Sequence, residues 1–78
     1  MLKINEFKDG EKKAIETLNK IRNLILEADK KFKNSITYKY NAFENFVDKS
    51  IIRETLAMTR GIKEVKHNIS GTEILVSW

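Results

Sequence analysis

The chain contains no cysteine and no proline, and its 78 residues include only three glycines and one histidine. Without cysteine, neither a disulfide nor a thiolate zinc site can stabilise a core this small, so stability must come from packing or from self-association. A homodimer is therefore one hypothesis. Because proline is absent and the glycines stand alone, no segment resembles a flexible linker or a low-complexity tract.

Long apolar runs are also missing. Residues 1–10 alternate apolar with charged side chains, which is unlike a secretory signal or a membrane span. We therefore expect a cytoplasmic protein that does not associate with membranes. A chain of this length buries only about 60% of its unfolded surface and cannot divide its core, so we predict one compact domain over residues 1–78.

No motif for catalysis or for phosphate binding occurs in the sequence. Gly10, Gly61 and Gly71 lie too far apart for a phosphate-binding loop, and no G-x-S-x-G motif marks a nucleophile. His67 is the one side chain that ordinarily titrates near neutrality, and a lone histidine without cysteine or a neighbouring carboxylate is a poor metal site. We expect no catalytic residues, no cofactor and no metal, and hence a protein that is not an enzyme.

Apolar residues follow a helical period in the first half of the chain. Between residues 10 and 33 they recur at alternating spacings of four and three, at Ala14, Leu18, Ile21, Ile25, Ala28 and Phe32. This stripe predicts a continuous helix from about residue 11 to residue 32, buried along one side. Asp9 is placed to cap the start of the helix, and Asn34 is placed to end it.

The period changes to two after this helix. Ile36, Tyr38 and Tyr40 alternate with polar residues and share one face of residues 35–41. Such alternation predicts a half-buried strand whose apolar side faces the core.

A second helix is expected to follow this strand. Asn41 and Glu44 have the spacing of a capping pair, and Gly61 is placed to close the helix in a left-handed conformation. The broad apolar stripe of this helix comprises Phe43, Phe46, Val47, Ile51, Thr55 and Met58. Ile52 and Leu56 fall on the opposite side, so the helix either contains a break or is buried on two sides.

Residues 62–78 predict a hairpin, because Ser70 and Gly71 supply the glycine that a tight two-residue turn or its bulged variant needs between two alternating segments. In this register Val65 lies directly opposite Val76, and both side chains should be buried. The apolar face of the hairpin would comprise Val65, Ile69, Ile74, Val76 and Trp78.

The order helix, strand, helix, strand, strand predicts an α+β domain with a mainly antiparallel three-stranded sheet. The two helices should cover the face that carries the tyrosines and Trp78, and a short additional strand is an option at residues 2–4. From Ile36 to Val76, chiefly through Gly61–Val65, the chain resembles the β-α-β-β portion of ferredoxin-like domains. The metal-binding members of that group depend on a cysteine pair that is missing here, so the resemblance implies no activity.

Two surfaces are candidates for binding. The first combines cations with aromatic rings and would bind nucleic acid through Lys30, Lys31, Lys33, Tyr38, Lys39 and Tyr40. The alternative for this surface is structural, because lysines complement the dipole at a helix end and the tyrosines fit a core face.

The second candidate surface is apolar and would bind another protein or a second copy of the chain. It comprises the residues that flank or oppose the helical stripes, namely Leu24, Leu26, Ile52 and Leu56. The alternative is that the chain's own sheet and helices cover these side chains.

The net charge of +4 permits an acidic partner without requiring one. Our leading hypothesis is a non-enzymatic protein-binding module, a small regulator or inhibitor of the kind that phages and mobile elements encode. The alternative is a nucleic-acid-binding domain that uses the lysine and tyrosine surface. A third and more distant reading is a small enzyme or metal protein built around His67.

Overall fold

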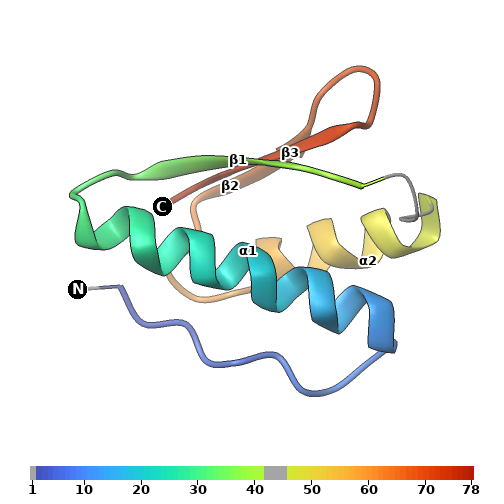
Figure 1. Cartoon of the computed structure of the whole chain (residues 1–78), viewed down its shortest axis with the longest axis horizontal. Coiled ribbons are helices and arrows are strands. Elements are labelled where there is room, and N and C mark those ends of the chain that lie inside the picture. Colours follow the sequence, from blue (N-terminus) through green and yellow to red (C-terminus); the bar gives the residue numbers. More distant parts are fainter. Residues whose placement is uncertain (1, 42–45) are drawn as a thin grey trace.

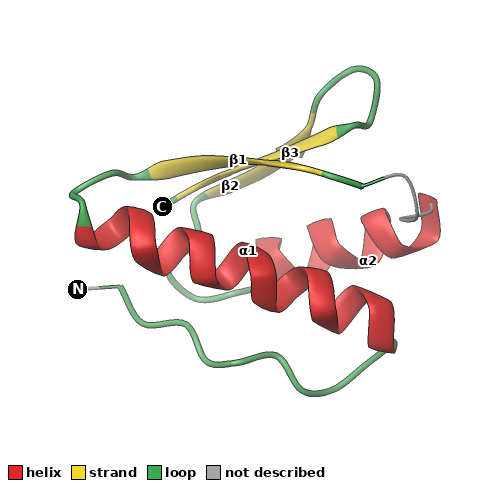
Figure 2. Cartoon of the chain, in the orientation of Figure 1, coloured by secondary structure: helices red, strands yellow, loops and turns green. Residues whose placement is uncertain are grey.

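The computed structural model describes residues 2–41 and 46–78. The elements in chain order are helix α1 (Lys12–Lys30), strand β1 (Ser35–Lys39), helix α2 (Phe46–Ala57), strand β2 (Glu64–His67) and strand β3 (Glu73–Ser77). Figures 1 and 2 show their arrangement, with the sheet on one side and both helices on the other. The predicted α+β order is confirmed.

The three strands form one sheet in the order β1-β3-β2, and β3 is antiparallel to both neighbours. β1 and β2 therefore run parallel to each other, and α2 connects them while β3 occupies the place between them, a split β-α-β arrangement. This arrangement contains the β-α-β-β succession expected from the sequence. Because α1 and α2 lie on the same side of the sheet (Figure 1), the sheet is covered on one face.

The hairpin register is the predicted one, with Val65 opposite Val76. Val76 is fully buried, whereas Val65 is only partly buried because β2 lies at an edge of the sheet. The turn is wider than predicted: the last ladder bond joins the N–H of Asn68 to the carbonyl of Glu73 at 3.1 Å. Ile69 therefore lies in the loop and is fully exposed, so its assignment to the buried face is wrong.

The core lies between the helices and the sheet. Helix α1 contributes Ala14, Thr17, Leu18, Ile21, Ile25 and Ala28, which confirms its predicted stripe as far as Ala28. From β3, Ile74 and Val76 are fully buried against the helices. The buried stripe of α1 ends at Ala28, because Phe32 lies beyond the end of α1 and its side chain is 98% exposed. Its assignment to the buried stripe is wrong.

Where its side chains are described, from Asp48 onward, helix α2 turns inward the side opposite to the predicted stripe. Ile52 and Leu56 are fully buried, whereas Met58 is 85% exposed. The sequence offers two apolar sides, and the position of α2 against both α1 and β2 decides which of them turns inward. Phe43 and Glu44, assigned to the stripe and to the capping pair, lie outside the described residues, and so do the side chains of Phe46 and Val47 of the predicted stripe.

No strand forms at residues 2–4, and this part of the chain runs along α1 instead. The side chains of α1 take the place of a partner strand. Asn19 accepts a hydrogen bond from the N–H of Phe7 and donates one to its carbonyl, both at 2.9 Å, and Arg22 donates to the carbonyl of Ile4 at 2.7 Å. These bonds satisfy the backbone of the segment while Ile4 is buried in the core.

Asp29 joins two distant parts of the chain. Its carboxylate accepts a hydrogen bond from the N–H of Leu2 at 2.8 Å and another from Nε1 of Trp78 at 3.3 Å. Gly61 lies beside this junction, where a β-carbon would stand 2.7 Å from Cδ1 of Leu2 and where φ is +98°. Glycine is therefore required at this position both for close packing and for the left-handed backbone predicted there.

The start of α1 is capped by Glu11 and not by Asp9. The carboxylate of Glu11 accepts hydrogen bonds from the N–H groups of Lys13 at 3.0 Å and Ala14 at 3.3 Å. Asp9 precedes the capping position, so its predicted role is wrong. The longer glutamate side chain performs the task that shorter polar side chains usually perform at this position.

The end of α1 has Schellman geometry, with phenylalanine where glycine is usually found. The N–H of Lys33 donates to the carbonyl of Ala28, and the N–H of Phe32 donates to that of Asp29, both at 3.0 Å. Phe32 has φ of 62°, in the left-handed region. Helix α1 thus ends before Asn34, at a residue that combines backbone strain with a ring in solvent.

We expect Phe32→Gly to raise the free energy of unfolding by about 1 kcal/mol, because glycine adopts the left-handed conformation without the steric penalty of a β-carbon. Urea denaturation measures this difference. The control Phe32→Ala retains the penalty and removes only an exposed ring, so it should change stability by less than about 0.5 kcal/mol. A Phe32→Gly protein that is less stable than the wild type would contradict this account of the helix end.

Candidate docking groove

Strand β1 lies at an edge of the sheet, and within residues 2–41 and 46–78 it pairs with β3 alone. The N–H of Tyr40 donates to the carbonyl of Thr72, and the N–H of Trp78 donates to that of Asn34, each at 2.9 Å. Because ladder bonds alternate along an antiparallel pair, even-numbered residues of β1 direct their backbone groups toward β3. The backbone groups that point outward belong to Ser35, Thr37 and Lys39.

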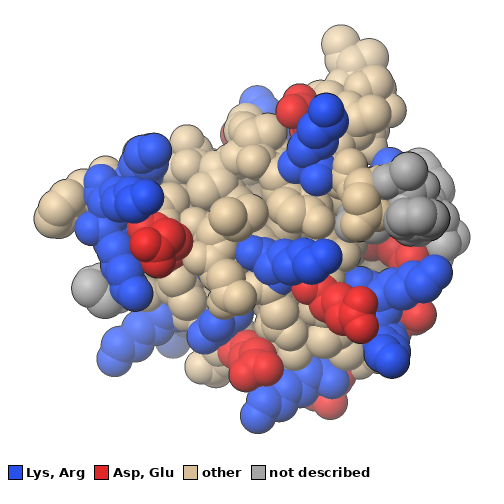
Figure 3. Space-filling view, in the orientation of Figure 1, with Lys and Arg blue, Asp and Glu red and all other residues tan. Residues whose placement is uncertain are grey.

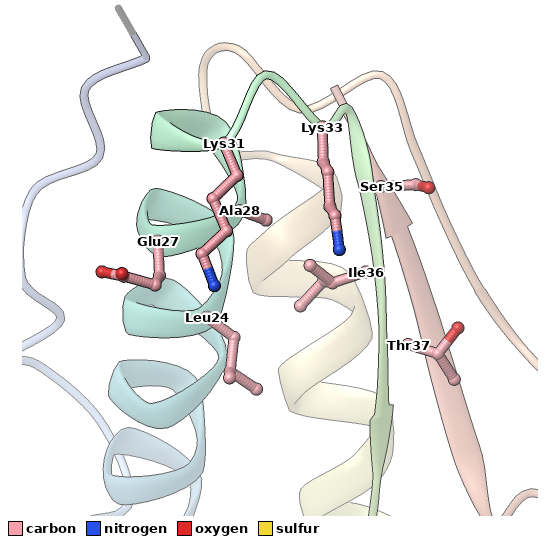
Figure 4. Close-up of a pocket in the computed structure, with 8 residues that line it drawn as sticks. All are labelled: Leu24, Glu27, Ala28, Lys31, Lys33, Ser35, Ile36 and Thr37. Atoms are coloured by element: carbon pink, nitrogen blue, oxygen red, sulfur yellow. The ribbon is translucent and has the colours of Figure 1, made fainter.

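A groove of about 390 Å³ runs between α1 and this edge. Its lining residues are Leu24, Glu27, Ala28, Lys31, Lys33, Ser35, Ile36 and Thr37. Figure 4 shows that Leu24 and Ile36 project into the space between the helix and the strand from opposite sides. Leu24 is 45% exposed, so an apolar floor lies open to solvent beside unpaired backbone groups.

A second hollow extends this groove along α1. It shares Leu24 and Glu27 with the first and is completed by Lys20, Asn23 and Tyr38. The ring of Tyr38 stands edge-on to that of Tyr40, at 5.6 Å between centroids and 84° between planes. Packing against the buried Tyr40 therefore holds the Tyr38 ring in place at this end of the groove.

The groove is positively charged. In Figure 4 the ammonium groups of Lys31 and Lys33 point into the space between α1 and β1, while the carboxylate of Glu27 points away from the strand. Among the described residues, the one salt bridge joins Glu64 and Lys66, so neither groove lysine is neutralised by an acidic side chain. Figure 3 shows Lys and Arg side chains gathered at the end of the molecule where α1 leads into β1.

Phe32 stands where α1 leads into β1, and the sequence pattern did not predict that its side chain is exposed. Its spacing from Ala28 fits the helical stripe, which is why the pattern placed it in the core. The signal that argued otherwise was the polar run around it, Lys30, Lys31, Lys33 and Asn34. The result is an exposed aromatic ring among cations.

The residues predicted to bind nucleic acid do not form one surface. Tyr40 is buried, and its hydroxyl is hydrogen-bonded to His67, so it is not available to stack on a base. Lys39 lies on the sheet face away from the helices, across from Glu73. Lys30 lines a hollow beside the segment at residues 2–5, on another side of α1.

The rest of that set lies together. Lys31 and Lys33 line the groove, and Tyr38 lines its extension. The structure thus divides the predicted lysine and tyrosine surface, and three of its members belong to the groove.

The four residues predicted to bind protein lie in three different places. Leu24 is exposed in the groove, and Leu26 lines the hollow between α1 and the N-terminal segment. Ile52 and Leu56 are fully buried in the core, so neither is a surface anchor and their assignment is wrong. Leu24 is the member of the set that presents a large apolar surface beside an open edge.

His67 belongs to a separate cluster. Its Nε2 and the hydroxyl of Tyr40 are hydrogen-bonded at 2.7 Å, and Nζ of Lys49 lies 5.0 Å from the centre of the Tyr40 ring. Burial lowers the pKa of His67 below its ordinary value, and the positive charges of Arg53 and Lys49 lower it further. The side chain therefore stays neutral near pH 7 and fills a structural role beside Tyr40.

Groups that would hold a metal ion are not found in the described chain, where no three His, Asp or Glu side chains cluster suitably. Likewise, none of the described helices has the length and apolar character needed to cross a membrane. Comparisons with protein-family models, with curated proteins and with solved structures gave no match. Function has to be inferred from the residues of this chain.

The lowered pKa of His67 makes a pH-dependent contribution to stability. Because the unfolded chain binds a proton at about pH 6.5 and the folded chain only at lower pH, the free energy of unfolding should fall as the pH drops below about 6.5. Urea denaturation between about pH 7.5 and 5.5 should show this fall in the wild type and a smaller fall in His67→Gln. Identical profiles would show that His67 titrates alike in both states.

Proposed function

We propose that this chain is a non-enzymatic protein-binding module that holds its partner in the groove between α1 and β1. The observation that supports this function is the position of Leu24, an exposed leucine that faces Ile36 beside the unpaired edge of the sheet. An apolar anchor surrounded by polar groups is the usual centre of a protein interface. A partner would bury this anchor.

The groove supplies three kinds of contact at one place. Leu24, Ala28 and Ile36 offer apolar surface, the edge of β1 offers backbone hydrogen bonds, and Lys31 and Lys33 offer positive charge. Apolar burial provides binding energy, while charge and backbone geometry select the partner. A catalytic centre would instead require a nucleophile or an acid–base pair, and His67 is engaged with Tyr40 away from the groove.

The substitution Leu24→Glu should abolish retention of the partner, because it places a charge at the apolar centre of the interface. The measurement is affinity capture from the native cells on immobilised wild-type and variant protein, followed by quantitative mass spectrometry. Binding of the recovered protein is then repeated by calorimetry with purified components.

The matched control is Met58→Glu, which places the same charge on a side chain that is 85% exposed at the end of α2. It should retain the partner as the wild type does. A partner that survives Leu24→Glu, or that is lost equally in the control, would exclude the groove as its site. If the wild type retains no protein at all, the protein-binding function is wrong.

A second candidate function has its own supporting observation. The fully exposed ring of Phe32 lies between Lys31 and Lys33 in the sequence, and single-stranded nucleic acid is bound by exposed rings of this kind beside cations. This arrangement replaces the predicted one, in which Tyr38 and Tyr40 supply the stacking rings.

Titration of labelled single-stranded DNA and RNA tests this second function. Binding should weaken with salt, and replacing Lys31 and Lys33 with glutamine should flatten the logarithmic salt slope by about 1.4, from roughly 0.7 for each cation. Phe32→Ala should weaken binding about tenfold, since stacking of each base contributes about 1–3 kcal/mol. Lys39→Gln is the control and should have a smaller effect. No binding at tens of micromolar would eliminate the nucleic-acid function.

A further inference from the structure

We propose that the partner enters the groove as an extended acidic segment that pairs with β1 and becomes a fourth strand of the sheet. This inference rests on the proposed function and specifies what the groove binds. The backbone of β1, its side chains and its surrounding charge each constrain the occupant.

The backbone of β1 requires an extended occupant. Within the described residues, the strand order leaves the outward N–H and C=O groups of Ser35, Thr37 and Lys39 without a neighbouring strand. An incoming strand satisfies such groups in alternation, whereas a helix in the same groove would leave them unpaired. Because β1 has five residues, the paired part of the segment should be about five residues long.

The side chains around the groove require alternation in the occupant. Successive side chains of an added strand point to opposite faces of the sheet. Those on the helix side meet Leu24 and Ile36, so they should be apolar. Those on the other side lie level with Ser35, Thr37 and Lys39, a polar row. The matching segment alternates apolar residues with polar or acidic ones.

The charge around the groove selects an acidic occupant and disfavours a second copy of this chain. Lys31 and Lys33 point into the groove, Lys20 lines its extension, and the carboxylate of Glu27 is turned away. A second copy of this chain carries the same net charge of +4, so it would not supply counter-ions for these lysines. A segment with Asp or Glu side chains meets the same cations as counter-ions.

A random linear decapeptide library displayed on phage is the probe. It is panned on immobilised wild-type protein, and peptides that also bind Leu24→Glu are removed. We expect enrichment of sequences in which Asp or Glu alternates with apolar residues. Enrichment of basic sequences, of helical apolar spacing or of no sequence would overturn the inference.

The most enriched acidic peptide is then synthesised, and amide hydrogen exchange of the labelled protein is followed by nuclear magnetic resonance. Strand addition should protect the outward N–H groups of Ser35, Thr37 and Lys39, whereas that of Ile36, already directed toward β3, should change little. Protection without this alternation, or protection elsewhere on the molecule, would show that the peptide does not extend the sheet.

Two sets of variants complete the test. Methylating the peptide's backbone nitrogens that face β1 should abolish binding, because these nitrogens donate to the strand. Methylating the intervening nitrogens, which point away from β1, should leave binding intact. The double change Lys31→Glu and Lys33→Glu should weaken binding on the order of tenfold, and Lys66→Glu, on another strand, should weaken it less. Equal losses from both lysine variants would contradict a local acidic contact.

Failure of this inference is distinguishable from failure of the proposed function. If a purified cellular partner is lost in Leu24→Glu but leaves the exchange of Ser35, Thr37 and Lys39 unchanged, the groove binds protein without strand addition. If acidic peptides extend β1 but no cellular partner depends on Leu24, the proposed function fails and the edge remains a binding site for acidic strands.

Discussion

The whole structure depends on the pairing of β3 with both neighbouring strands. Ile74 and Val76 of β3 are fully buried beneath the helices, and the strand is hydrogen-bonded on both sides. Because β3 takes the centre, β1 and β2 become edges. The helices lie along one face of this sheet, and α1 lies beside β1, where the distance between helix and strand leaves the groove open. The candidate site is thus a direct result of strand order.

Features that do not serve stability gather at the junction of α1 and β1. Phe32 occupies a position where glycine would be relaxed, Leu24 exposes apolar surface, and Lys31 and Lys33 stand together without an acidic partner among the described residues. Other polar side chains do serve stability. The carboxylate of Asp29, for example, accepts hydrogen bonds from two distant parts of the chain. Local conflict with stability at one place is typical of a functional surface.

The sequence alone predicts the elements whose apolar pattern leaves only one side that can be buried. The stripe of α1 as far as Ala28 and the register of Val65 against Val76 follow from periods of 3.6 and 2. Helix α2 has two apolar sides, and only tertiary packing selects the one with Ile52. Phe32 kept the helical spacing after the helix had ended. The edge position of β1, and therefore the groove, depends on strand order, which no local pattern encodes.

The separation of the paired strands along the chain also bears on how the sheet forms. Partners in β1 and β3 are 34 to 42 positions apart (73 − 39 and 77 − 35), whereas His67 and Ile74 of the hairpin are seven apart (74 − 67). The hairpin should therefore assemble first and β1 should join late, since closing a longer loop costs more entropy. Both β1 and β2 are edge strands, but β1 lacks the short hairpin connection that ties β2 to β3, so β1 should leave the sheet more readily by local unfolding. Any segment that pairs with its free edge would retain it, so partner concentration and the stability of the sheet are coupled by mass action.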